Sequence, residues 1–537
     1  MLEKILNNIF SKNYLPFLVL AGFGFILYFQ AFFFGFSYLD DNVLILGNQT
    51  FLSNINNIFW SFGTDVFHLF NSSAFYYRPL LTISFILDYQ IGGASPFIYH
   101  FVNVLLHILA ACLLFIFLKK LDYKKELAFL FSFIFLIHPV MTQTVAWIPG
   151  RNDSLLAIFL LLTFIFFVKY VREEKNRNLF WSLFFCGLAF FTKESGILII
   201  PIIFFYFYFI YQKQNKEAGS EKKKAWRQSF YFFIGSIGLA GVWAGLRYLV
   251  LRNSTGITLP EMIKSVFFNL PAVIQFLGKI FLPFNLSVLP IMQDTTFVYG
   301  IIAAILLFLL IFFTKNKRWN FILLGFGWFL AFLLPSFIRP NTSLVADFIE
   351  HRLYVPIIGI FIVLLETDFI RKIDFKKRSA QIAIGFLLIL FCAITLIHSR
   401  SFADKMAFWK DAVAHSPHYP LAHRNLGAMD YLAGDLADAE KESKIALALN
   451  PTEQMAHNNL GLIYAEENKF DQAETEYKME LANNPYYDDA YYNLGILYWQ
   501  EKKYDAAIAD WKETLEINPN YAVSPEIWQI LQNSNSK

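Results

Sequence analysis

Long apolar segments separated by short charged loops constrain the fold of this chain more than any other feature. A helix needs roughly 17 to 25 apolar residues to cross about 30 Å of hydrocarbon. Such segments lie near residues 14–36, 97–118, 127–144, 154–171, 179–192, 196–212, 229–250, 297–314, 320–338, 353–370 and 380–398. We therefore expect residues 1–400 to form an all-α, polytopic membrane domain of about eleven transmembrane helices. The content of 56% hydrophobic and 19% aromatic residues agrees with this class.

Two further stretches mix apolar and polar positions. Residues 79–95 suit a helix that lies on the outer membrane surface. Residues 258–290 are expected to form a surface or re-entrant segment, because an additional span there would move the later basic loops to the outer side of the membrane.

Lysine and arginine are concentrated in alternate loops. The basic loops fall at 119–125, 169–177, 213–227, 315–318 and 371–378, and the positive-inside rule makes them cytoplasmic. The same register places the N-terminus inside and the C-terminal domain outside. Because amino-acid usage rich in Phe, Ile, Lys and Asn fits an AT-rich bacterial genome, we expect the cytoplasmic (inner) membrane of a bacterium. The net charge of +3 is too small to indicate a nucleic-acid partner.

The C-terminal segment repeats with a period of 34 residues. Asn-Leu-Gly recurs at 425–427, 459–461 and 493–495, and Asn-Pro follows at 450, 484 and 518. This is the period of the tetratricopeptide repeat, a helix–turn–helix unit. Residues 401–537 are therefore predicted to form an extracytoplasmic α-solenoid with an incomplete leading repeat, repeats at 420–453, 454–487 and 488–521, and a C-terminal cap.

Such solenoids bind partners in a concave groove lined by the first helix of each repeat. Asn425, Asn459 and Asn493 recur at one position of that helix, where they could hydrogen-bond the backbone of a bound protein segment. The alternative is that these asparagines only satisfy helix packing and solvent.

Asp40 and Asp41 stand directly after the first apolar segment, on the predicted outer face. Ionisable residues beside membrane spans are costly and mark functional sites, so this pair is a candidate catalytic centre. Helix capping at the interface is the structural alternative, although one aspartate would suffice for it.

Four more motifs lie on the same predicted side. They are Tyr76-Tyr77-Arg78-Pro79, His138-Pro139 with Gly150-Arg151-Asn152-Asp153, Lys193-Glu194-Ser195-Gly196, and His351-Arg352-Leu353-Tyr354. In order and spacing the chain resembles the GT-C glycosyltransferases, particularly the transmembrane and tetratricopeptide-repeat O-mannosyltransferases and their bacterial relatives. The resemblance implies an inverting transfer of a sugar from a polyprenyl-phosphate donor to an acceptor hydroxyl, expected on a protein, at the extracytoplasmic face.

The resemblance also implies roles for individual residues. Asp40 is the first choice for the base that takes the acceptor proton, and Asp41 would hydrogen-bond the acceptor, orient its neighbour or hold a cation. Adjacency alone leaves open which aspartate has which role. Arg78, Lys193 and Arg352 would bind the donor phosphate. The supporting residues would be Glu194, His351 and Tyr354. For Arg78 and Lys193, snorkelling to the membrane interface is the alternative.

Two expectations concern charge partners and cofactors. Arg151 and Asp153 are expected to form an ion pair at the border of the site. No cofactor is required, and metal-independent transfer is the default. Two aspartates cannot complete a metal cage, although Mg²⁺ or Mn²⁺ could also use phosphate and water oxygens.

Two other functions remain open at this point. A transporter or flippase of a lipid-linked glycan would place charges deep within several spans, whereas here they gather at one face. A noncatalytic, membrane-anchored repeat scaffold would not need that polar cluster.

Overall fold

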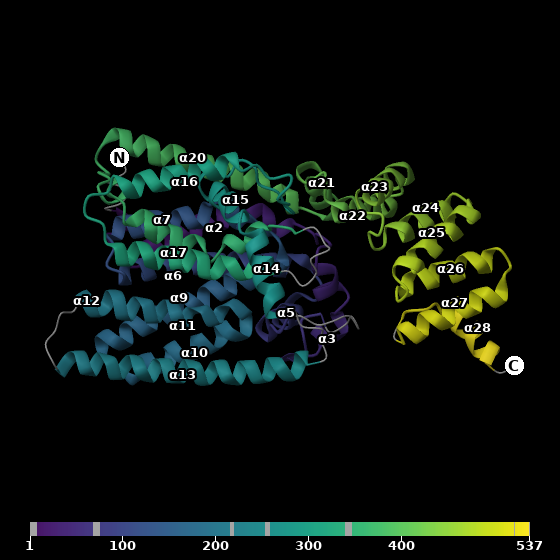
Figure 1. The fold of residues 1–537 in the computed structure, drawn as a ribbon, viewed down its shortest axis with the longest axis horizontal. Helices are drawn as coiled ribbons and strands as arrows, with labels where there is room; N and C mark the ends of the chain where they lie inside the picture. Colours follow the sequence, from purple (N-terminus) through teal and green to yellow (C-terminus); the bar gives the residue numbers. More distant parts are fainter. Residues whose placement is uncertain are drawn as a thin grey trace. The chain divides into compact units, whose positions relative to one another are not determined.

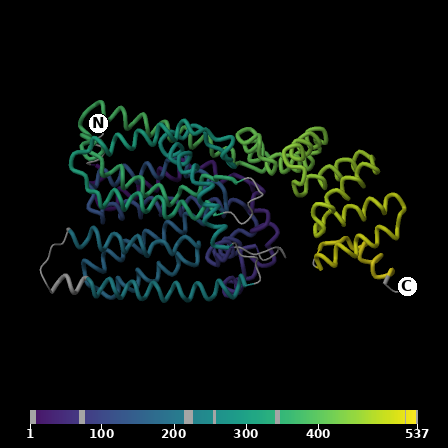
Figure 2. Tube along the Cα trace, viewed as in Figure 1, coloured from purple at the N-terminus to yellow at the C-terminus, as the bar shows by residue number. Residues whose placement is uncertain are grey.

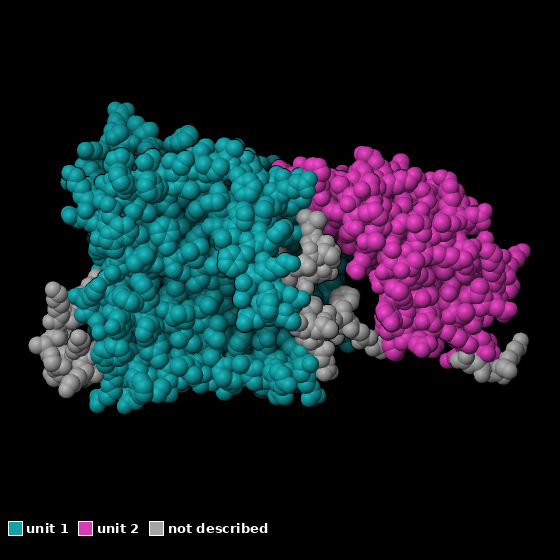
Figure 3. All heavy atoms as spheres, in the orientation of Figure 1, with its two compact units in different colours: residues 1–405 teal, residues 406–537 magenta. Residues whose placement is uncertain are grey.

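A computed structural model describes residues 8–67, 76–214, 220–252, 258–338, 346–519 and 521–535. These segments are helices joined by turns, with one isolated β-bridge between Ile291 and Asp347, which confirms the all-α class. The chain divides into two compact units, residues 1–405 and residues 406–537 (Figure 3).

The apolar segments of the first unit carry helices that run side by side (Figures 1 and 2). Antiparallel neighbours in the sequence pack on one another, as α9 does on α10 and α17 on α18. The principal helices are α2 (Leu15–Leu27), α6 (Pro96–Lys120), α7 (Lys125–Ile137), α9 (Arg151–Glu173), α10 (Asn176–Thr192), α11 (Ile199–Phe205), α13 (Ser220–Leu251), α16 (Val298–Phe312), α17 (Trp319–Leu333), α18 (Ile357–Leu365) and α20 (Arg378–Ser399).

The expected count of about eleven spans is not confirmed. Within the described segments, 6 helices are long and apolar enough to cross a membrane, or up to 8 if each of two bent pairs is one span. The difference arises because several apolar segments are interrupted or short. α7 stops at the His138-Pro139 break and continues at an angle of 51°, and α18 has only 9 residues. Proline supplies no N–H to the helix, which explains such a break.

The two segments of mixed polarity are also helical. The first forms α5 (Pro79–Gly92). The second forms α14 (Leu259–Asn269) and α15 (Ala272–Phe281), which are bent by 50° at Leu270-Pro271, as in a broken span or a re-entrant loop. Thr258 and Glu261 form a reciprocal capping box at the start of α14.

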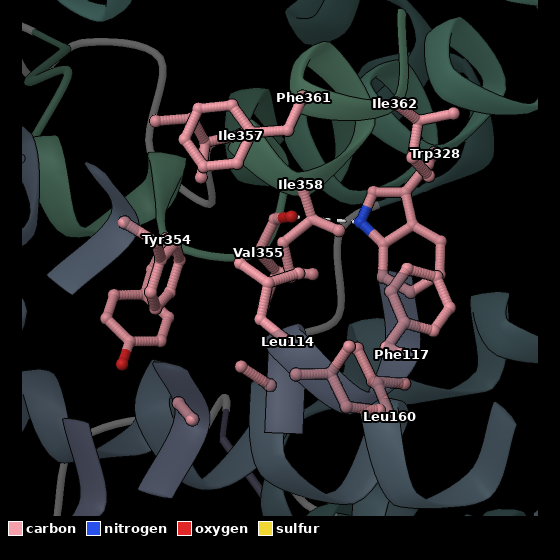
Figure 4. Close-up of a cluster of buried hydrophobic side chains, with 14 of the residues drawn as sticks. Leu114, Phe117, Leu160, Trp328, Tyr354, Val355, Ile357, Ile358, Phe361 and Ile362 are labelled. Atoms are coloured by element: carbon pink, nitrogen blue, oxygen red, sulfur yellow. Dashed lines mark hydrogen bonds between the residues drawn. The ribbon is translucent and has the colours of Figure 1, made fainter. Parts of the chain in front are cut away.

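The core of the first unit is aromatic and aliphatic. Around Trp328, side chains of α6 and α9 face those of α18, and the indole N–H donates to Val355 O at 2.9 Å (Figure 4). In a bilayer, helices associate through close packing because lipid is as apolar as leucine. The crossing of α17 and α18 accordingly uses Gly325 and Gly359, where an added Cβ on either would collide with the other's carbonyl oxygen.

In its described residues, the second unit consists of three antiparallel helix pairs flanked by single helices. The pairs are α22 (Pro420–Leu432) with α23 (Leu436–Leu449), α24 (Ala456–Glu466) with α25 (Phe470–Asn483), and α26 (Asp488–Gln500) with α27 (Tyr504–Ile517). α21 (Lys405–His415) precedes them and α28 (Pro525–Asn535) follows. Ala439, Ala473 and Ala507 are fully buried where paired helices meet. The period of 34 residues therefore corresponds to one helix pair.

Candidate active site

The acidic pair lies in a turn with unusual backbone geometry. Tyr38 and Asp40 have φ angles of 60° and 64°. This left-handed conformation costs on the order of 1–3 kcal/mol per non-glycine residue and is concentrated at functional sites. Trp147 is the residue that follows α8 (Thr142–Ala146). It supports the turn, because its indole N–H donates to Leu39 O at 2.9 Å.

Asp41 is only 1% exposed and holds the turn together. Its Oδ2 accepts hydrogen bonds from Ser37 N at 2.7 Å and from Ser37 Oγ at 2.9 Å. Its buried Oδ1 has no hydrogen-bond partner among the described residues. Burial raises the pKa of Asp41 to about 7, although the Ser37 hydrogen bonds oppose that shift.

Asp40 is partly exposed. Burial raises the pKa of Asp40 to about 6, the charge of Asp347 adds to the increase, and the charge of Arg78 opposes it. Asp40 thus lies within electrostatic reach of a cation and a second carboxylate. A carboxyl group with this pKa is ionised at neutral pH and remains basic enough to take a proton.

Arg78 stands at the residue before α5 and pairs with Glu194. Its Nη2 and Nε lie 3.1 and 3.2 Å from Glu194 Oε2. The guanidinium stacks over the Tyr76 ring at 4.3 Å. With the Asn152 amide oriented so that both its ends are satisfied, its oxygen accepts from Arg78 Nη1 at 3.1 Å and its nitrogen donates to Thr192 O at 2.8 Å.

Lys193 pairs with Asp153 in the first turn of α9, at 2.7 Å from Nζ to Oδ1. The other oxygen of Asp153 lies 3.8 Å from His351 Nε2. Burial lowers the pKa of His351 well below its usual range, and the positive charges of Lys193, Arg352 and Arg78 lower it further. His351 is therefore a neutral imidazole at physiological pH.

Arg352 lies in the 3₁₀ turn η9 (Glu350–Leu353). Its Nη2 is 2.7 Å from Asp347 Oδ1, and its Nη1 donates to Asp347 O at 2.7 Å. The neighbouring His351 packs against the Trp147 ring, with centroids 5.1 Å apart. These contacts place the arginine fork beside the acidic turn.

The structure joins most of the predicted residues in one ionic site. Each cation has a carboxylate partner, and these side chains retain between 6% and 26% of their exposed surface. The members are Asp40, Arg78, Lys193, Glu194, His351 and Arg352, together with Asp153 and Asp347. The site thus combines one raised-pKa carboxyl group with three cations that could receive a phosphate.

Tyr354 does not contact these charged side chains through its hydroxyl. It is fully buried, and its O–H donates to His107 Nδ1 at 2.8 Å, since His107 Nε2 faces Leu136 O at 3.0 Å. Figure 4 shows Tyr354 beside the apolar core. Tyr354 therefore packs in the core, and its hydroxyl hydrogen-bonds to His107 and not to the charged cluster.

The expected ion pair between Arg151 and Asp153 is wrong. Arg151 is fully buried and pairs with Asp88 of α5, while its Nε donates to Asn103 at 2.7 Å. Asp153 serves Lys193 instead, so sequence reasoning missed it as a site residue. The sequence signal for the true partner of Arg151 was Asp88, because a charged residue within an apolar helix requires a partner of opposite charge.

Gly196 explains how the Lys193-Glu194 segment is held. The 3₁₀ turn η6 (Glu194–Leu198) folds back on the end of α10, and a Cβ at Gly196 would collide with Ala189 O. Lys193 N also donates to Ala189 O at 3.2 Å. The turn therefore depends on glycine at this position.

The repeat asparagines use their amide groups within the solenoid. Asn459 Nδ2 donates to Arg424 O of the preceding repeat at 3.1 Å, and Asn493 Nδ2 donates to Asn458 Oδ1 at 3.0 Å. Asn425 Nδ2 bonds Leu421 O of its own helix at 3.0 Å. These bonds favour the packing interpretation for the amide nitrogens.

A metal site would need several converging ligands. Among the residues that the structure describes, no group of three or more His, Cys, Asp or Glu side chains is arranged to hold a metal ion.

The fold and site define a helical membrane-type unit with an ionic centre, followed by a repeat solenoid. Residues 62–254 match the dolichyl-phosphate-mannose-protein mannosyltransferase family, and residues 431–488 and 488–521 match tetratricopeptide repeats. These matches confirm the resemblance inferred from the motifs and support a glycosyltransferase.

Relatives with curated names agree with these matches. The chain is 33% identical over 196 residues to protein O-mannosyl-transferase TMTC2 of Mus musculus, an alignment that covers 34% of this chain and 23% of that protein. It is 34% identical over 137 residues to protein O-mannosyl-transferase TMTC1 of Mus musculus, covering 24% of this chain and 14% of that protein. The chain thus matches about a quarter or less of the length of these relatives.

Proposed function

We propose that this chain is an integral-membrane glycosyltransferase of the GT-C type that transfers a sugar, with inversion, from a polyprenyl-phosphate donor to a hydroxyl group of a protein. The observation that carries the proposal is the placement of Asp40 within electrostatic reach of Arg78 and Asp347. These two residues belong to a cluster in which three cations, Arg78, Lys193 and Arg352, are each held by a carboxylate. The relatives named as protein O-mannosyl-transferases make mannose the first sugar to test.

The chemistry requires a base and a stabilised leaving group. The Asp40 carboxylate takes the proton of the acceptor hydroxyl while its oxygen attacks the anomeric carbon from the face opposite the phosphate. The bond between the anomeric carbon and the phosphate oxygen breaks, and its electron pair leaves with the lipid phosphate. The products are the inverted glycoside, polyprenyl phosphate and protonated Asp40.

The cations of the site stabilise the negative charge that develops on the departing phosphate. The Arg352 fork can donate two hydrogen bonds to one phosphate, whereas Lys193 acts as a point charge. Asp153, Glu194 and Asp347 hold these cations in place before the donor binds. Such prior positioning avoids reorganisation during the reaction.

The proposal places this site on the extracytoplasmic face of a bacterial cytoplasmic membrane, with the N-terminus in the cytoplasm and about eleven membrane passages. The repeat unit recruits the protein acceptor or a partner through its concave groove. Transfer needs no metal or other cofactor.

The test is transfer from a panel of radiolabelled polyprenyl-phosphate sugars to membrane proteins, using purified enzyme and an Arg352→Ala variant. Label in protein with the wild type, and its loss with folded Arg352→Ala, is the expected result. Movement of labelled donor between leaflets without transfer would replace the proposal by a flippase. Capture of a partner with neither activity would replace it by a scaffold.

A further inference from the structure

Glu350, the residue before His351, is fully buried and receives three donors from three parts of the fold. Its Oε1 accepts from Lys279 Nζ of α15 at 2.9 Å and from Ser287 N at 2.9 Å. Its Oε2 lies 3.1 Å from His398 Nε2 in the last turn of α20. The carboxylate therefore ties the start of η9 to α15, to the loop after α15 and to α20.

A second buried polar group completes this connection. Gln143 accepts from His351 N at 3.0 Å and donates to Val288 O at 2.9 Å. Consecutive residues of the loop, Ser287 and Val288, are thus joined to consecutive residues of the turn, Glu350 and His351. The backbone that carries Arg352 is held on both sides.

The end of α20 and the residues that follow it also contact the segment that leads to the acidic pair. Gln30 Nε2 donates to Leu396 O at 2.9 Å, and Gly35 N donates to Ala403 O at 2.7 Å. The Lys405 ammonium lies 4.7 Å from the centroid of the Tyr38 ring, two residues before Asp40. Glu350 begins the turn that carries Arg352, and through His398 it is also connected to the segment that carries Asp40.

We infer that Glu350 is a positioning residue, which with Lys279 and His398 fixes the Arg352 turn relative to the Asp40 turn. This inference rests on the proposed function, because it assigns a consequence for donor use. Glu350 itself touches neither donor nor acceptor in this scheme. Misplacement of a binding group by about 1 Å can reduce a rate by about 100-fold.

The fold supplies a matched control at the other end of α18. Glu366 is also fully buried, accepts from Arg318 Nε at 2.9 Å and accepts from Tyr123 O–H at 2.7 Å. Glu366 lies just after the C-terminal end of α18, whereas Glu350 lies before its N-terminal end. Glu366→Gln therefore removes an equally buried carboxylate from a position away from the Arg352 turn.

The experiment measures melting temperature, kcat and donor KM for Glu350→Gln, Glu366→Gln and His398→Ala, with hydrogen exchange of the amides of residues 350–354. Glu350→Gln should raise donor KM about tenfold, increase exchange in this turn and change kcat less, since a phosphate-binding group is displaced. Glu366→Gln should lower the melting temperature without either effect. His398→Ala keeps the ion pair between Lys279 and Glu350. It should therefore raise donor KM and exchange in the turn by less than Glu350→Gln does.

Equal donor KM for folded Glu350→Gln and wild type, or the same increase in Glu366→Gln, would overturn the inference. If Glu350→Gln does not fold, the comparison of His398→Ala with Glu366→Gln decides in the same way. Absence of transfer by the wild type refutes the proposed function instead, and the exchange measurements then still decide whether Glu350 fixes the turn.

Discussion

Lys193 and Asp153 form an ion pair of 2.7 Å between the turn after α10 and the first turn of α9. The same carboxylate faces His351, so one residue of α9 organises two of the positively charged or ionisable groups of the site. Arg151, two residues earlier, anchors that helix end to α5 and α6. The position of Lys193 is thus tied to the packing of α9.

Asp153→Asn should weaken donor use. The substitution leaves Lys193 without its counter-charge and loosens its side chain, so donor KM should rise about tenfold, the loss expected for roughly 1.4 kcal/mol. Steady-state kinetics with varied donor concentration measures this. Asp122→Asn removes the exposed Arg172 pair at the far end of α9 and should change little. Equal kinetics for the two variants would contradict the role of Asp153.

Arg352→Lys should reduce transfer although it keeps the positive charge. Lysine cannot reproduce the fork that bonds Asp347 and, in the proposal, the donor phosphate. Loss of one charge-assisted bond of about 1.5–3 kcal/mol corresponds to a roughly 10- to 160-fold lower kcat/KM. A lysine variant as active as the wild type would show that point charge alone suffices.

The pH profile of kcat/KM should report the Asp40 base. Burial raises the pKa of Asp40 to about 6, so below that value kcat/KM should fall about tenfold per pH unit and above it should level off. A profile flat down to about pH 4, the ordinary range of a carboxyl group, would contradict an Asp40 base.

The free energy of unfolding should fall as the pH rises, whereas kcat/KM rises. Because the folded-state pKa values of Asp40 and Asp41 lie above their unfolded values, the folded chain binds more protons between about pH 4 and pH 7. The contribution of these groups to stability is therefore present below pH 4 and is lost as the pH rises. Thermal melts of the wild type and Asp40→Asn across this interval should show a weaker decline in the variant.

Metal chelation should leave transfer unchanged. The proposed charge stabilisation relies on arginine and lysine, and the described residues contain no cluster suited to hold a metal. Assays with EDTA, then with added Mg²⁺ or Mn²⁺, test this directly. Activity lost with EDTA and restored by one ion would require a cation bridged by phosphate oxygens.

Much of this fold follows from periodicity. The 34-residue repeat predicted the helix pairs because each pair is a local unit whose small residues, such as Ala439 and Ala473, recur at the contact. Apolar length located helices but not span number, because Pro139 and similar breaks divide segments that composition alone makes continuous.

The motifs predicted which residues would gather but not how they would pair. Arg78 and Glu194 are 116 residues apart, and Lys193 and Asp153 are 40 apart. Partner choice at such separations depends on which faces of α5, α9 and α10 meet, and no local spacing encodes that. Asp347 was missed for a different reason, since a single acidic residue outside a motif gives no signal of its own.

The most direct test of the account compares transfer by Asp40→Asn and Asp41→Asn variants, with melting temperature measured for both. Asp40→Asn should lose at least about 100-fold in kcat, as expected for removal of a general base, and should fold as the wild type does. Asp41→Asn should melt at lower temperature, because the Ser37 hydrogen bonds are weakened, yet retain measurable transfer. Wild-type kcat in Asp40→Asn would contradict the account.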